Sequence, residues 1–206
     1  MHDGQMDVEV VEALDDDRTV IRRLVQLYHY DFSEFDGSDV NLHGEYLHRY
    51  FDEYWTDSDR RAFLFRVEGA LAGFALVFTG EPHDIAEFFV MRKYRGRGVG
   101  AHAAASLFGQ FAGRWTVRQQ LTNPAATAFW RKAIRYPFQE HEQGTEIVQS
   151  FTAGRLVLRA AWESGSGVPR ARWLAGLNHI NDAMPPHQPT REPGSYRQKQ
   201  RRAALR

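Results

Sequence analysis

Apolar residues follow two different spacings along the chain, and each spacing predicts one kind of element. Short apolar runs, or apolar residues that alternate with polar ones, predict strands. The expected strands are residues 6–14, 61–68, 71–78, 85–91, 114–121, 145–151 and 155–162. Apolar residues three and four positions apart predict helices. The expected helices run from the acidic residues 15–17 to Tyr28 and beyond, over about 43–55, from Gly100 to near Gly113, and from Pro124 to before Tyr136, with a loop at 33–41.

Residues 85–111 carry the most chemical information in this pattern. A buried strand interrupted by one carboxylate, Glu87, leads into a turn with glycines at alternate positions, residues 95–100. An Ala-rich helix follows the turn. Glycines let the backbone approach an anion, and the N-terminus of a helix adds a partial positive charge. The stretch therefore predicts a phosphate-binding site between a strand and a helix.

Spacing separates the classes of phosphate ligand. A Walker A loop requires Gly-Lys-Ser/Thr, which is excluded because Ala101 and His102 follow the last glycine. Gly96, Gly98 and Ala101 match the looser dinucleotide pattern G-x-G-x-x-A, which also requires an acidic residue about 20 positions later. Residues 117–120 contain none. A nucleotide-binding protein stays an alternative on the glycine pattern alone.

A third pattern, Arg/Gln-x-x-Gly-x-Gly/Ala, is matched by Arg95, Gly98 and Gly100. This match resembles the pyrophosphate-binding motif of the GNAT superfamily of acyl-CoA-dependent N-acyltransferases. In many sequences of that family a strand glutamate lies eight residues before the motif, and Glu87 lies at that distance from Arg95.

A downstream match lies at the start of the next expected helix. The family often carries Asn-x-x-Ala-x-x-x-Tyr there, and Asn123, Ala126 and Trp130 occupy those positions, with Trp in place of Tyr. The resemblance covers about residues 8–160. It implies an α/β fold with a mixed, mostly antiparallel central sheet flanked by helices. It also implies transfer of an acetyl group from acetyl-CoA to a primary amine.

The resemblance also assigns the cofactor contacts. The turn amides and arginines would hold the pyrophosphate, the end of the strand would pair with the pantetheine arm, and the Val90 N–H would stabilise the oxyanion. The residues assigned in this way are Val90, Met91, Arg95, Gly96, Arg97, Gly98, Val99, Gly100, Ala101, Asn123 and Trp130.

Glu87 is the candidate general base. A carboxylate inside an apolar strand is costly unless it has a partner, and burial raises the pKa of such a group toward a useful range. The alternative is a structural carboxylate. Because the base varies within the family, Glu81, His83 and Asp84 are held in reserve.

Two of the other assigned residues have open roles. An indole is too weak an acid to replace the tyrosine that commonly protonates the leaving thiolate, so Trp130 is expected only to pack against the cofactor. The leaving thiolate would then take its proton from water or from Tyr136, or the enzyme would work without a general acid. Asn123 is expected either to cap its helix or to contact the cofactor arm.

Charge divides the chain into two parts. Up to Ala153 there are 16 Lys and Arg against 23 Asp and Glu, and from Gly154 onward there are 10 against 3. An acidic body suits a cationic amine. We expect an acetyltransferase domain over residues 1–162, and a linker with a basic tail, including one short amphipathic helix at about 173–180, over residues 163–206.

Composition limits the remaining classes. The chain has no cysteine, and its nine histidines show no metal-binding helix spacing, so no metal cofactor is expected. Neither a secretory signal nor a membrane-spanning run is found, so a cytoplasmic location is expected, with no membrane partner. The basic tail without interleaved aromatic residues is weak support for nucleic acid. A non-catalytic acyl-CoA-binding module of the same fold is the main alternative, and the sequence leaves the acceptor and a homodimer open.

Overall fold

A seven-stranded sheet in the order β1-β2-β3-β4-β5-β7-β6 organises residues 6–154, which are the part of the chain that the computed structural model describes. All neighbouring strands are antiparallel except β4 and β5, which are parallel. The strands are β1 (Val8–Glu12), β2 (Arg60–Val67), β3 (Ala70–Phe78), β4 (His83–Val90), β5 (Gly113–Gln120), β6 (Phe138–Gln143) and β7 (Glu146–Ala153). This is the mixed, mostly antiparallel architecture that the sequence predicted, and the last expected strand and the tail lie outside the described residues.

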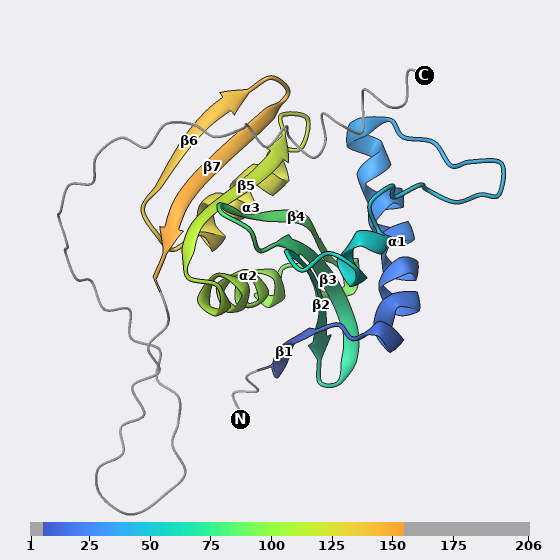
Figure 1. Cartoon of the computed structure of the whole chain (residues 1–206). Coiled ribbons are helices and arrows are strands. Elements are labelled where there is room, and N and C mark those ends of the chain that lie inside the picture. The colour runs from blue at the N-terminus through green and yellow to red at the C-terminus, as the bar shows by residue number, and fades with distance from the viewer. Residues whose placement is uncertain (1–5, 155–206) are drawn as a thin grey trace, which may run out of the picture. The chain divides into compact units, whose positions relative to one another are not determined.

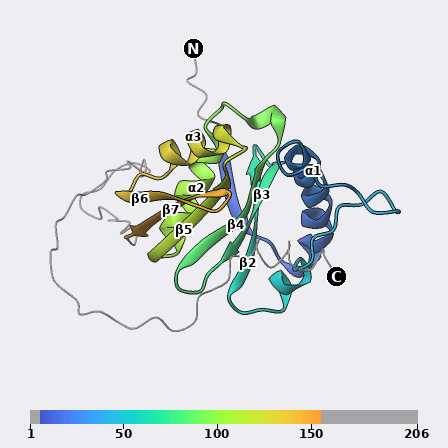
Figure 2. The ribbon, with the colours of Figure 1, turned by 90° about the horizontal axis from the view of Figure 1, so that it is seen from above.

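Helices cover both faces of the sheet (Figures 1 and 2). α1 (Arg18–Asp36) lies on one face, and α2 (Val99–Gln110) and α3 (Pro124–Ala133) lie on the other. Each interface is a separate apolar cluster, and the alternation of side chains along β2 feeds both. Phe63 and Phe65 pack toward α2 and α3, whereas Leu64 packs toward α1. No helix in residues 6–154 is both long and apolar enough to cross a membrane.

The two central strands part from each other after a short parallel ladder. β4 pairs with β5 only at His83, Asp84 and Ile85, whereas β4 pairs with β3 along most of its length. A register shift places Glu87 opposite Leu76 and Ile85 opposite Val77, so β4 has an extra residue, a β-bulge, at Ala86. A bulge bends the strand and changes its twist. The C-terminal half of β4 consequently presents one of its edges to an opening rather than to β5.

Three sequence predictions need correction. Residues 43–55 do not form a helix; only a short 3₁₀ turn, Asp52–Trp55, is present. The side chain of Asn41 accepts hydrogen bonds from the amides of His43 and Glu45, and Gly44 has φ 76°, so the backbone there follows a turn. Aromatic residues at helical spacing in this segment reflect packing onto α1 and the sheet instead.

The other two corrections concern the ends of elements. α1 continues to Asp36, past the expected start of the loop at 33, and ends where Gly37 takes a left-handed conformation and donates to the Ser33 carbonyl oxygen. β6 was not predicted because most of its side chains are exposed and polar, so it lacks apolar alternation. The other expected strands within residues 6–154 are confirmed to within two residues at each end.

Gly73 gives a test of the contact between β3 and β4. A Cβ atom added at Gly73 would lie 2.0 Å from the carbonyl oxygen of Phe89 and 3.0 Å from Cδ2 of Phe65. Gly73→Ala is therefore expected to lower the free energy of unfolding by at least about 2 kcal/mol, measured by urea denaturation. Gly154→Ala is the control, because nothing lies within 4 Å of its added Cβ. Equal stability of the two variants would contradict this packing.

Candidate functional site

The turn between β4 and α2 exposes backbone amides at the start of a helix. Gly96 and Gly98 adopt left-handed conformations, with φ 73° and 84°, and Gly98 is the N-cap of α2. The first helical hydrogen bond runs from the His102 amide to the Gly98 carbonyl oxygen, at 2.9 Å. The amides of residues 99–101 therefore precede the helical ladder, and the first turn contains no acidic residue. This end of the helix can bind an anion.

Gly100 has a different function from the other two glycines. A Cβ atom at this position would lie 3.0 Å from Cε2 of Phe129 on α3 and 3.5 Å from Cγ2 of Val90 on β4. The small residue thus allows α2 to begin close to both neighbours. Val99 and Tyr94, which flank the turn, are buried in the same apolar cluster.

The arginines of the turn are placed unequally. Arg95 donates through Nε to the Val90 carbonyl oxygen at 2.7 Å and forms an ion pair with Asp31 of α1. Arg92 also pairs with Asp31, at 2.9 Å. Arg97 is exposed at the tip of the turn. Arg92 and Arg95 therefore attach the turn to α1, whereas Arg97 is exposed to solvent.

The end of β4 presents an amide to the opening. The Met91 amide donates to the Ala72 carbonyl oxygen, at 2.8 Å, on the β3 side. Because successive residues of a strand direct their amides to opposite edges, the Val90 amide faces away from β3. That edge is the one that β5 no longer pairs with after Ile85.

Glu87 lies inside the sheet on the face toward α1. Its side chain is 4% exposed, and Oε1 is 3.7 Å from Nε2 of His48, whose side chain is 3% exposed. The ring of His48 lies 5.7 Å from that of His29 on α1. A carboxylate and two imidazoles thus form a buried polar cluster beside the apolar layer, on the strand whose far end carries the glycine turn.

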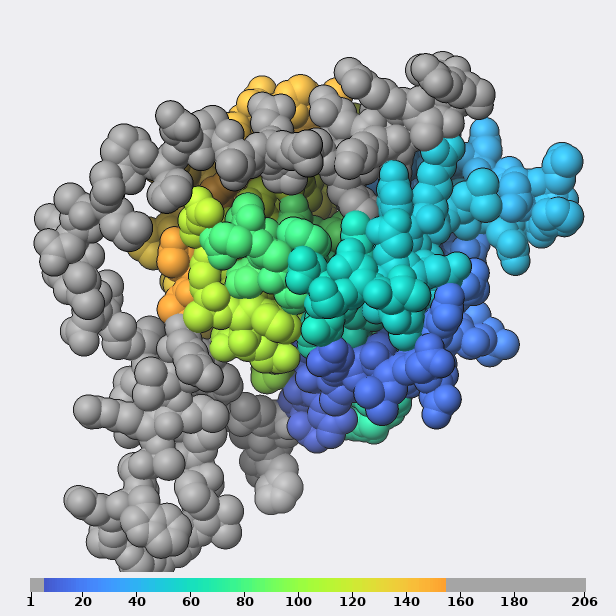
Figure 3. All heavy atoms as spheres, in the orientation of Figure 1, coloured from blue at the N-terminus to red at the C-terminus, as the bar shows by residue number. Residues whose placement is uncertain are grey.

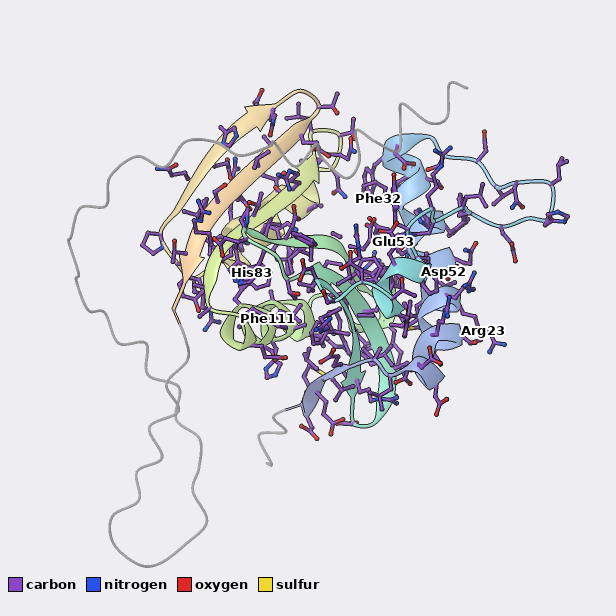
Figure 4. The ribbon with its side chains drawn as sticks, in the orientation of Figure 1. Arg23, Phe32, Asp52, Glu53, His83 and Phe111 are labelled. Carbon is purple, nitrogen blue, oxygen red and sulfur yellow. The ribbon has the colours of Figure 1, made fainter. Side chains whose placement is uncertain are left out.

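The three reserve residues lie at the opposite end of β4. Glu81 pairs with Arg114 at 2.6 Å, Asp84 pairs with Arg118, and Nε2 of His83 lies 3.2 Å from the Ala112 carbonyl oxygen. Figure 4 shows His83 with Phe111 on the α2 side of the sheet. These residues hold β4 to β5 where the strands pair.

The downstream residues are placed by α3. The Asn123 side chain accepts from the Ala126 amide at 3.0 Å, which confirms the cap. Trp130 is 5% exposed and its ring lies 5.0 Å from Phe88 and 4.9 Å from Phe129. Burial raises the pKa of the Tyr136 hydroxyl, so it stays protonated at neutral pH.

Sequence reasoning missed His48 and Asp31. His48 lies in the segment that was expected to be a helix, 39 residues before Glu87, and no motif connects the two. Asp31 lies 64 residues before Arg95. Neither pairing had a signal in the spacing. Among residues 6–154 no group of three His, Cys, Asp or Glu side chains could hold a metal ion.

Comparison with known proteins gives one family and one fold. The family model described as "Acetyltransferase (GNAT) family" matches residues 23–134. An acetyltransferase from Thermus thermophilus is 18% identical, with a TM-score of 0.56 over 70% of this chain and 96% of that chain. No curated protein matches the chain.

Two further solved structures contain coenzyme A. PaiA N-acetyltransferase from Thermoplasma acidophilum, in complex with coenzyme A, is 9% identical, with a TM-score of 0.52 over 71% of this chain and 99% of that chain. Spermidine N-acetyltransferase from Vibrio cholerae, in complex with CoA and spermine, is 11% identical, with a TM-score of 0.54 over 71% and 95%. At these identities the similarity is one of fold.

The ion pairs of Asp31 predict a pH-dependent stability. Burial pushes the pKa of the Asp31 carboxyl upward, but hydrogen bonds from Arg92 and Arg95, together with their charges, outweigh it and hold that pKa below its ordinary value. A lowered pKa in the folded state stabilises the protein above the unfolded value of about 3.9, and this stabilisation is lost as the pH falls through the folded value. Asp31→Asn is therefore expected to lower the melting temperature at pH 7, and this deficit should shrink below about pH 4.

The measurement is thermal unfolding of both proteins across this pH range. Asp39→Asn, which removes an exposed carboxylate three residues after the end of α1, is the control and should change the melting temperature little. A deficit of the Asp31 variant that is constant with pH would show that the ion pairs do not stabilise the fold.

Proposed function

Because the chain belongs to the acetyltransferase (GNAT) family, we propose that it transfers an acetyl group from acetyl-CoA to a primary amine. The observation that carries the proposal is the position of the glycine turn. The turn follows the end of β4, whose edge is not paired with β5 after Ile85. It leads into α2, whose first amides have no hydrogen-bond partner within the helix. A pyrophosphate on the turn and a thioester arm along the strand would then be parts of one molecule.

The residues of the turn fit the diphosphate of acetyl-CoA. Amides at the start of α2 and the exposed Arg97 supply hydrogen bonds and positive charge. Arg95 is engaged with Asp31 and the Val90 carbonyl oxygen, so its contribution is to hold the turn in shape. We therefore assign the direct phosphate contacts to residues 97–101 and the arm to Val90 and Met91.

The transfer step requires an uncharged amine, a donor to the oxyanion and a destination for the amine proton. The Val90 amide faces the open edge and is our candidate oxyanion donor. Glu87 is the candidate carboxylate that assists removal of the proton from the amine, since it is buried on the same strand. The coenzyme A thiolate is a good leaving group and can take its proton from water, which agrees with a tryptophan at position 130.

The acidic body of the protein supports a cationic acceptor. The first 153 residues carry seven more acidic than basic side chains, 23 against 16. Such a field raises the local concentration of positively charged amines. The spermidine acetyltransferase of Vibrio cholerae is one example of this fold with a polycationic molecule, spermine, in its structure.

Gly98 tests the cofactor site. Gly98→Val places a β-branched residue at a left-handed position, φ 84°, at the point where the amides must face the diphosphate. The dissociation constant of acetyl-CoA, measured by isothermal titration calorimetry, is expected to rise by about tenfold or more. Gly144→Val is the matched control, since Gly144 is also left-handed, with φ 63°, but lies between β6 and β7.

Unchanged acetyl-CoA binding by the Gly98 variant would remove the turn from the site. A wild-type protein that is stabilised by NAD or ATP in a thermal-shift assay, and not by acetyl-CoA, would favour the nucleotide-binding alternative.

Glu87 tests the chemistry. Glu87→Gln keeps the size of the side chain but removes its negative charge and its capacity to assist proton removal, so turnover is expected to fall by about 100-fold. The affinity for acetyl-CoA should stay close to that of the wild type. The measurement is release of coenzyme A thiol with DTNB over a panel of polyamines, amino sugars and peptides. Wild-type turnover in the variant would exclude Glu87, and binding of acetyl-CoA without thiol release from the wild type would indicate a non-catalytic module.

A further inference from the structure

The imidazole of His48 is a buried polar group whose ring nitrogens need explanation. Its side chain is 3% exposed, and among residues 6–154 neither ring nitrogen has a hydrogen-bond partner. The nearest charged atom is Oε1 of Glu87, 3.7 Å from Nε2, which is too long for a direct hydrogen bond. Buried polar groups are almost always bonded, so this exception requires an explanation.

The position of His48 is built by several contacts. The side chain of Gln26 on α1 donates to the Tyr46 carbonyl oxygen at 3.0 Å and accepts from the Tyr46 amide at 2.8 Å. Two residues later His48 enters the layer between α1 and β4, where its ring lies 6.1 Å from Phe51. Figure 3 shows that part of the segment just after α1 projects from the body. The side chain of His48, later in the same segment, is buried. A segment without regular structure is thus fastened so that an imidazole faces the Glu87 carboxylate.

We propose that His48 and Glu87 bind the nitrogen of the acceptor amine together and that His48 takes up the proton it loses. This inference rests on the proposed acetyltransferase function. A nitrogen at about 2.9 Å from both atoms, the usual hydrogen-bond distance, would bridge the 3.7 Å that separates them. The amine would complete the hydrogen bonds that His48 lacks within the described residues, and the distances would tighten in the substrate complex.

The step balances without another reactant. The amine nitrogen forms a bond to the acetyl carbon, the bond from that carbon to sulfur breaks, and the sulfur keeps the electron pair. One N–H proton passes to Nε2 of His48, where the Glu87 carboxylate offsets the new positive charge, and then to water. The thiolate takes a proton from water.

The pH dependence of turnover tests the proposal, because only a neutral imidazole can accept the proton. Among residues 6–154, Glu87 on β4 and His29 on α1 are titratable side chains that lie beside His48. With the best amine of the panel, kcat/KM of the wild type should rise with pH. His48→Gln should lower kcat/KM at neutral pH by about tenfold or more and remove this rise, whereas His29→Gln should keep it. His48→Asn, which cannot carry the proton either, must behave like His48→Gln.

The controls separate this inference from the function on which it rests. His43→Gln changes an exposed histidine of the same segment and should leave both rate and pH profile unchanged. Each variant should bind acetyl-CoA with wild-type affinity, which shows that the fold is intact. Suppose that the wild type acetylates amines. The role of His48 is then overturned if kcat/KM of the His48 variants still rises with pH, or if the rise disappears in His29→Gln and not in the His48 variants. Absence of transfer to any amine by the wild type would overturn the proposed function as well.

Discussion

The parting of β4 from β5 is the constraint on which the rest of this structure depends. Two parallel strands that stayed paired would satisfy each other's backbone groups and leave nothing for a ligand. Here the ladder ends after Ile85, and the extra residue at Ala86 bends β4 while β5 continues along β7. The ion pairs of Glu81 and Asp84 fasten the strands where they meet. The open edge is therefore fixed at one end and leads to the glycine turn at the other.

α1 contacts both the glycine turn and the segment that carries His48. Its Asp31 holds the arginines of the glycine turn, its Gln26 holds the backbone at Tyr46, and its His29 packs against His48. One helix thus positions groups that come from two distant parts of the sequence.

The local sequence was sufficient to predict an element wherever its conformation depends on residues close to it in the chain. The strand, glycine turn and helix at 85–110 were predicted because the conformations of Gly96 and Gly98 and the cap at Asn123 are short-range properties. The burial of Glu87 followed from an apolar strand around it. The segment at 43–55 was predicted wrongly because its aromatic spacing fits a helix, while the turn at Asn41 and the side chain of Gln26 engage its backbone instead.

The sequence by itself determined the order of most elements, the glycine turn, the family to which the pattern points and the carboxylate in the strand before that turn. These features are encoded by residues close to one another along the chain, where backbone geometry fixes distances. Only the tertiary structure decided which residues meet Glu87 and Arg95, and it selected His48 and Asp31. His48 and Glu87 are 39 residues apart, and Asp31 and Arg95 are 64 apart. These contacts depend on how α1 packs against the sheet and on where the bulge directs β4, which the spacing of residues along the chain does not predict.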